Sequence, residues 1–94
     1  MEIIIPKKFN IFGLTYKVMQ TRKVDKDDNW GEHSIVHKRI KVKKDLNQEQ
    51  KEITYLHELV HTVLDNLEYN ELSSNEVFVE RFSKALHQIL KTSE

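Results

Sequence analysis

Residues 57–61 of this chain read His-Glu-Leu-Val-His, a spacing that joins two metal-binding side chains to a carboxylate. In an α-helix, residues four apart lie one turn apart on the same side, so His57 and His61 can bind one zinc ion together. Glu58 then lies beside the metal, where its carboxylate can take a proton from a water molecule that the metal activates and later pass it to a leaving amine. The pattern predicts both a zinc ion and a hydrolytic reaction.

The sequence around these five residues fits an amphipathic helix. Apolar residues recur at three- and four-residue spacing and form one stripe: Ile53, Leu56, Val60, Val63, Leu64 and Leu67. His57 and His61 fall on the border of that stripe, and Glu58 lies further from its centre, as expected for side chains of a half-buried cleft. The competing interpretation is two helix-surface histidines that happen to flank a glutamate.

Length and composition restrict the protein to a modest single domain, which we expect to span residues 1–94. Lys plus Arg and Asp plus Glu number 15 each, so no overall field draws the chain toward nucleic acid or a membrane. Without cysteine, a bound metal must use His, Asp or Glu, and a cytoplasmic protein is the simplest inference. The first residues carry too short an apolar run for a signal peptide.

The N-terminal half has the composition of strands and the C-terminal half that of helices. Residues 9–24 predict a strand with a bend at Gly13, residues 25–29 a polar loop, and residues 31–35 and 39–43 two further short strands. Together they predict a small antiparallel sheet of about three strands. The Lys and Arg residues between positions 38 and 44 lack the interleaved aromatics of a nucleic-acid site and are better explained as charges protecting an edge strand.

Two capping patterns place the helices. Asn47 and Gln50 have the spacing of a capping box, which starts a helix over residues 48–68 with the His-Glu-Leu-Val-His motif in its second half. Ser73 and Glu76 fit a second capping box, for a last helix over residues 74–91. The apolar residues of that last helix are Phe78, Phe82, Ala85, Leu86, Ile89 and Leu90. A sheet followed by two packed helices predicts an α+β domain.

This order of elements resembles the minimal zincin metallopeptidases of gluzincin type, including small phage- and prophage-encoded proteins and the core of the ImmA/IrrE-type peptidases. The resemblance covers about residues 10–91, and its specific part is the motif at 57–61 and the stretch Val-Glu-Arg-Phe-Ser at 79–83. It implies a zinc ion held by two histidines and a downstream glutamate, and hydrolysis of a peptide bond in a protein partner such as a repressor or another regulatory protein. It also implies an edge strand beside the extended substrate, near residues 31–35.

Two glutamates compete for the place of the third zinc ligand. Glu80 follows His61 at a spacing similar to that of gluzincin aminopeptidases, and its setting with Phe82 looks like their Glu-x-Phe-Ala. Glu76 is well placed to cap its own helix, although Asn-Glu at positions 75–76 looks like the Asn-Glu of thermolysin-like enzymes. We therefore expect Glu80 to bind zinc, with Glu76 as the alternative. Glu76, Glu80, Ser83 and His87 form a polar line on the last helix, opposite the apolar stripe centred on Phe82. Either choice of ligand requires this polar line to face the two histidines.

Several supporting roles stay open at this level. Asp65 lies one turn after His61 and is either a hydrogen-bond acceptor for a ligand imidazole or an exposed carboxylate. Candidate donors to a developing oxyanion are Tyr16, Tyr55, Tyr69, His33 and His87. The leading function is a zinc metallopeptidase that uses Glu58. The alternatives are a zinc-binding regulatory or interaction module of zincin fold without turnover, and an interaction domain without metal.

Overall fold

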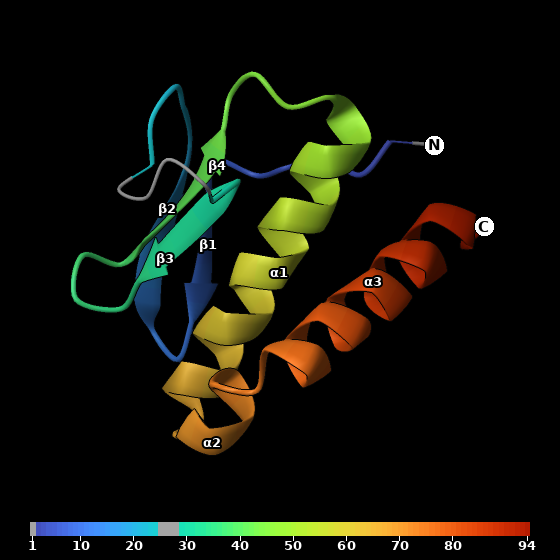
Figure 1. The fold of residues 1–94 in the computed structure, drawn as a ribbon. Helices are drawn as coiled ribbons and strands as arrows, with labels where there is room; N and C mark the ends of the chain where they lie inside the picture. Colours follow the sequence, from blue (N-terminus) through green and yellow to red (C-terminus); the bar gives the residue numbers. More distant parts are fainter. Residues whose placement is uncertain (1, 25–28) are drawn as a thin grey trace.

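A computed structural model describes residues 2–24 and 29–94, and in these ranges a four-stranded sheet packs against helices. The elements are β1 (Lys8–Ile11), β2 (Leu14–Thr21), β3 (Gly31–Ser34), β4 (Arg39–Lys43), α1 (Gln48–Asn66), α2 (Asn70–Ser73) and α3 (Glu76–Thr92). Helix α1 lies between the sheet and α3, with α2 at the turn that joins the two long helices (Figure 1). The expected α+β class is confirmed. No helix within the described ranges is long and apolar enough to cross a lipid bilayer.

The sheet has one more strand than expected, and it is mixed rather than antiparallel. Its order is β1-β2-β4-β3, with an antiparallel pair at each side and a parallel pair, β2 and β4, in the middle. The single strand expected over residues 9–24 is a hairpin, because Phe12 (φ 50°) and Gly13 (φ 79°) form a tight turn with two positive φ angles. The polar loop expected at residues 25–29 lies, apart from Asn29, outside the described residues.

The basic strand β4 is not an edge strand, so that explanation of its charges is wrong. It lies between β2 and β3, with Ile40 and Val42 buried on its inner face. Its Lys and Arg side chains alternate with these residues and stand on the outer face, where Lys41 Nζ lies 3.5 Å from Glu32 Oε1. The strand beside it, β3, forms an edge of the sheet, as expected near residues 31–35, and β1 forms the opposite edge.

Gly31 lets this edge strand approach α1 closely. A Cβ atom at this position would lie 2.5 Å from Thr54 Cγ2 and 2.8 Å from the backbone oxygen of Lys41. Any other residue would push β3 away from the helix. Because residues two apart in a strand share a face, His33 points to the same side as Gly31, toward the second half of α1.

Both ends of α1 are capped, the first by side chains and the last by backbone groups. The predicted capping box of Asn47 and Gln50 is present at the start. The helix ends at Asn66, two residues earlier than expected, in a Schellman motif in which the Glu68 N–H donates to Asp65 O (3.1 Å) and the Tyr69 N–H donates to Leu64 O (2.9 Å). Glu68 takes the positive φ of 65° that this motif requires, and the chain turns back into α2.

The second predicted capping box is wrong. Residues 70–73 form the short helix α2, and Ser73, the predicted cap residue, is the buried last residue of that helix. Helix α3 begins at Glu76, and its N-cap is Asn75, whose Oδ1 accepts the Phe78 N–H at 3.1 Å. Glu76 is therefore the first residue of α3 and takes no part in the cap.

The polar line of α3 faces α1, which is the orientation that a zinc site requires. Val79, Ser83 and His87 are buried, whereas the side chain of Phe82 is 50% exposed and that of Ile89 is 60% exposed. Most of the apolar stripe predicted for this helix therefore faces outward. The rotation of α3 about its own axis, which we call its roll, is set by a buried polar contact and not by the distribution of apolar side chains.

That contact centres on Glu52, a fully buried carboxylate of α1. Its Oε1 lies 2.9 Å from His87 Nε2 and 3.2 Å from Lys91 Nζ, both on α3. Its Oε2 accepts hydrogen bonds from the Ile3 N–H and from Gln48 Nε2, each at 3.0 Å. Burial raises the pKa of Glu52, but these hydrogen bonds outweigh it and lower the pKa to about 2. The carboxylate thereby holds the N-terminal segment, α1 and α3 together.

Removing this carboxylate should destabilise the fold. We expect Glu52→Ala to lower the free energy of unfolding by about 3 to 5 kcal/mol near pH 7, because it leaves His87 and Lys91 without their counter-charge. The pKa of Glu52 is lower in the folded chain than its ordinary 4.5, so its contribution is complete above that pH and is lost as the pH falls toward 2. Urea unfolding at about pH 7 and about pH 3 should show a smaller effect at the lower pH. The exposed control Glu71→Ala should stay within about 0.5 kcal/mol of the parent at both pH values, and an equal effect of the two substitutions would contradict the assignment.

Candidate metal centre

A groove of about 730 Å³ runs between β3, α1 and the start of α3. Its walls include Gly31 and His33 from the edge strand, His57 and His61 from the middle of α1, and Glu76 from α3. The motif predicted to do chemistry therefore lies in a concave site and not on an open helix surface. This is the usual position of a binding or catalytic site.

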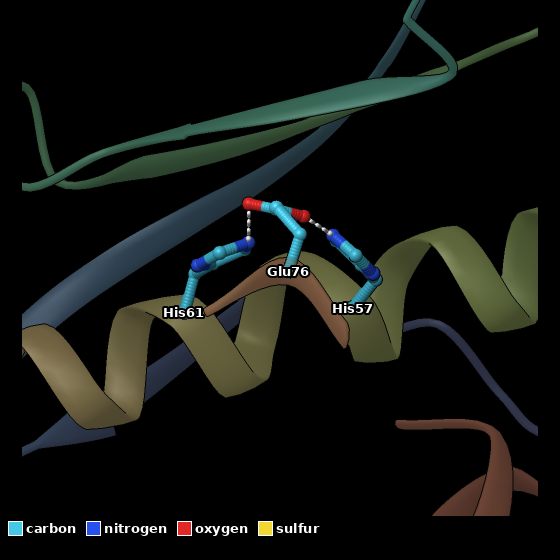
Figure 2. Close-up of side chains that lie close together, drawn as sticks. All are labelled: His57, His61 and Glu76. Atoms are coloured by element: carbon cyan, nitrogen blue, oxygen red, sulfur yellow. Dashed lines mark ion pairs between the residues drawn. The ribbon is translucent and has the colours of Figure 1, made fainter. Parts of the chain in front are cut away.

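Three side chains meet at the floor of the groove. Glu76 Oε2 lies 3.4 Å from His57 Nε2, and Glu76 Oε1 lies 3.2 Å from His61 Nε2. Figure 2 shows the Glu76 carboxylate between the two imidazole rings, which stand on successive turns of α1. One donor atom from each of the three residues lies within 4.8 Å of the other two.

These three residues fit a zinc ion. A tetrahedral zinc ion with bonds of about 2.1 Å needs roughly 3.4 Å between its donor atoms. The two N–O distances, 3.4 Å and 3.2 Å, have this size, and each is made to a different oxygen of Glu76. Two imidazoles and one carboxylate are also a donor set that zinc takes in catalytic sites, where the fourth position stays open. With one oxygen of Glu76 as the donor, the three donor atoms lie within 4.8 Å of one another, so the group could hold a metal once they draw together.

The structure brings Glu76 to the histidines and leaves Glu80, the expected third ligand, aside. Glu80 lies one turn further along α3, and its Oε1 is 3.0 Å from Lys84 Nζ. The hydrogen bond and the positive charge of Lys84 lower the pKa of Glu80. Because Asn75 caps the helix, the carboxylate of Glu76 is left to face His57 and His61, so the geometry favours the alternative ligand.

His61 is oriented by a hydroxyl group and not by Asp65. Its Nδ1 lies 3.1 Å from Ser73 Oγ in a buried contact. For Nε2 to offer its lone pair to a metal, Nδ1 must carry the proton and donate it to Ser73. Burial and the charge of the neighbouring His33 ring lower the pKa of His61, and the nearby Glu76 carboxylate opposes them only in part. The lowered pKa favours the neutral imidazole.

Glu58 is buried under the edge strand, whereas the helical projection placed it on the outer side of the apolar stripe. Its Oε1 lies 2.7 Å from His33 Nδ1, and Thr62 Oγ1 donates to its backbone oxygen at 2.9 Å. The carboxylate thus lies beside the pair His57 and His61 without belonging to the group that could hold the metal. This is the placement expected of a proton-transfer residue.

His33 links Glu58 to Asp65. Its Nε2 lies 3.3 Å from Asp65 Oδ2, and its ring stacks on that of His61 with 4.8 Å between centroids. Burial lowers the pKa of His33, but the two carboxylates outweigh burial and raise it. The structure therefore gives Asp65 a partner on the edge strand instead of a ligand histidine.

Of the five residues considered as oxyanion donors, His33 lines the groove and the other four do not. Tyr16 is buried, with its hydroxyl accepting from Asn66, and Tyr55 is buried in the core. Tyr69 is more than half exposed, and His87 pairs with Glu52. The sequence signal that singles out His33 is its place two residues after Gly31 on the predicted edge strand.

Comparisons of the chain with protein-family models, with curated proteins and with solved structures found no match.

Proposed function

We propose that the protein is a zinc-dependent metallopeptidase that hydrolyses a peptide bond in a protein partner. The observation that carries this proposal is the convergence of His57, His61 and Glu76 at distances suited to zinc, with the buried Glu58 carboxylate beside them. The resemblance of residues 57–61 to the zincin motif supports the same class of enzyme. Because the sequence contains no cysteine, we further propose that it acts in the cytoplasm.

In this proposal, His57, His61 and Glu76 hold the zinc ion. When bound, zinc supplies a Lewis acid that polarises the scissile carbonyl and lowers the pKa of a water molecule. Glu58 accepts a proton from that water and later gives it to the nitrogen of the leaving amine. His33 holds the Glu58 carboxylate through the 2.7 Å contact, and Ser73 holds the ring of His61.

The edge strand supports an extended peptide as the substrate. Strand β3 is paired with β4 on one side, and its residues line the groove along α1. A peptide that lies beside β3 can form backbone hydrogen bonds with it, and its side chains then point alternately into the groove and away from it. This arrangement would bring a backbone carbonyl past the two histidines and Glu58.

A zinc-binding module without turnover is the second candidate function. The observation that favours it is the close contact of Glu58 with His33, which occupies one oxygen of the carboxylate that has to accept a proton. In such a module the same three residues would hold zinc, and the groove would bind a partner without cutting it.

The two candidate third ligands should respond differently to the same exchange. We expect Glu76→Gln to weaken zinc binding at least about tenfold, because an anionic donor becomes a weak neutral one. Glu80→Gln, one turn away in the same helix, is the matched control and should stay within about twofold of the parent, because Glu80 pairs with Lys84. Competition with a chromophoric chelator measures both affinities. Weakening by Glu80→Gln alone would restore the assignment made from the sequence, and weakening by neither variant would remove both carboxylates from the metal.

The proposed mechanism depends on the carboxylate of Glu58. Glu58→Gln should keep zinc and the fold while lowering peptide cleavage by about 100-fold or more, the usual scale of general acid-base catalysis. Cleavage can be followed by mass spectrometry on a peptide library prepared from cell proteins, with Glu71→Gln as a control outside the groove. Equal cleavage by Glu58→Gln and the parent would rule out the mechanism. A parent protein that binds zinc and cuts no peptide would favour the module without turnover.

A further inference from the structure

The groove extends beyond the candidate metal centre toward the start of α1. There its walls are Trp30, Glu49, Gln50 and Ile53, which we call the distal pocket. Gln50 and His57 are seven positions apart in the helix, which at about 1.5 Å per residue is roughly 10 Å. An extended peptide covers that length with about three residues. A peptide cut at the metal centre would therefore place one of its side chains, about three residues from the cut bond, in the distal pocket.

An aromatic side chain forms one wall of the distal pocket. The side chain of Trp30 is 47% exposed, and Ile53 on α1 is partly buried in the same groove. A half-exposed indole inside a concave site offers a flat apolar face for the stem of a long side chain, and the same face attracts a cation. The distal pocket is thus suited to a long side chain.

The negative charge of the groove favours a long side chain that carries a positive charge over a neutral or acidic one. Its described lining contains five carboxylates and a single lysine, Lys84, whose Nζ is 3.0 Å from Glu80. Two of the other carboxylates, those of Glu58 and Glu76, contact the histidines of the centre. A third, that of Glu32, pairs with Lys41 on the outer face of the sheet. Within the described part of the chain, Glu49 forms no ion pair and no side-chain hydrogen bond, so its charge is available to a ligand.

We propose that the distal pocket binds a lysine or arginine side chain of the peptide substrate, about three residues from the bond that is cut. This inference rests on the proposed function for the use of the groove, and it adds the substrate class. The aliphatic stem of the side chain packs on Trp30 and Ile53, and its charged end reaches the carboxylate of Glu49. A leucine would fill the apolar wall and leave the carboxylate without a partner. A glutamate would be repelled by Glu49.

Trp30 is the one tryptophan of the sequence, so its fluorescence reports on the distal pocket directly. The zinc-loaded Glu58→Gln protein is titrated with three heptapeptides of alanine and glycine that differ at one central position, which is arginine, leucine or glutamate. We expect the arginine peptide to shift the Trp30 emission and to bind at least about fivefold more tightly than the other two. Adding Glu49→Gln should remove most of this preference, and Glu71→Gln, outside the groove, should leave it unchanged.

The outcomes separate this inference from the proposed function. Equal or tighter binding of the leucine peptide, an arginine preference that survives Glu49→Gln, or no binding of any peptide would overturn the inference. Zinc affinity is measured on the same samples by chelator competition. If the protein binds zinc but shows no preference for the arginine peptide, the proposed function stands and the inference of a basic substrate side chain is wrong. If the protein does not bind zinc but prefers the arginine peptide, and this preference depends on Glu49, the role of the distal pocket stands and the proposed metallopeptidase function is wrong.

Discussion

The buried carboxylate of Glu52 is the constraint on which the arrangement of the two long helices depends. Its ion pairs with His87 and Lys91 fix the roll of α3 on α1, and its bond to the Ile3 N–H fixes the N-terminal segment against both. With this roll, α3 turns a polar line toward α1 and leaves Phe82 half exposed. The first residue on that line, Glu76, consequently faces the histidines of α1. A charge buried away from the groove thus determines which carboxylate can complete a metal site.

The second constraint is the close approach of the edge strand to α1. Gly31 permits it because a Cβ atom there would collide with Thr54 and with the backbone of β4. The same approach covers Glu58 and sets His33 between Glu58 and Asp65. The strand that forms the wall of the groove therefore also holds the carboxylate proposed to transfer protons. The fold and the proposed chemistry depend on the same contact, so substitutions at Gly31 should affect both.

The parts of the fold and site that depend on local sequence could be predicted. The capping box of Asn47, the helix that follows it and the pairing of His57 with His61 on one side are set by neighbours within a few residues. The parts set by long-range polar contacts could not. Helical periodicity assigns the apolar stripe of α3 to the core, because it does not include the attraction of Glu52 for His87. Capping rules assign Ser73 and Glu76 to each other, whereas Ser73 contacts His61 and Asn75 takes the cap.

We propose that His57, His61 and Glu76 form one zinc site. A crystal structure of the protein reconstituted with zinc, with anomalous data at the zinc edge, tests it most directly. We expect one zinc ion per chain, bound by the Nε2 atoms of His57 and His61 and by a carboxylate oxygen of Glu76, with Glu58 beside the metal and not bound to it. Absence of zinc from the fully reconstituted protein, or zinc bound by Glu80 in place of Glu76, would contradict it.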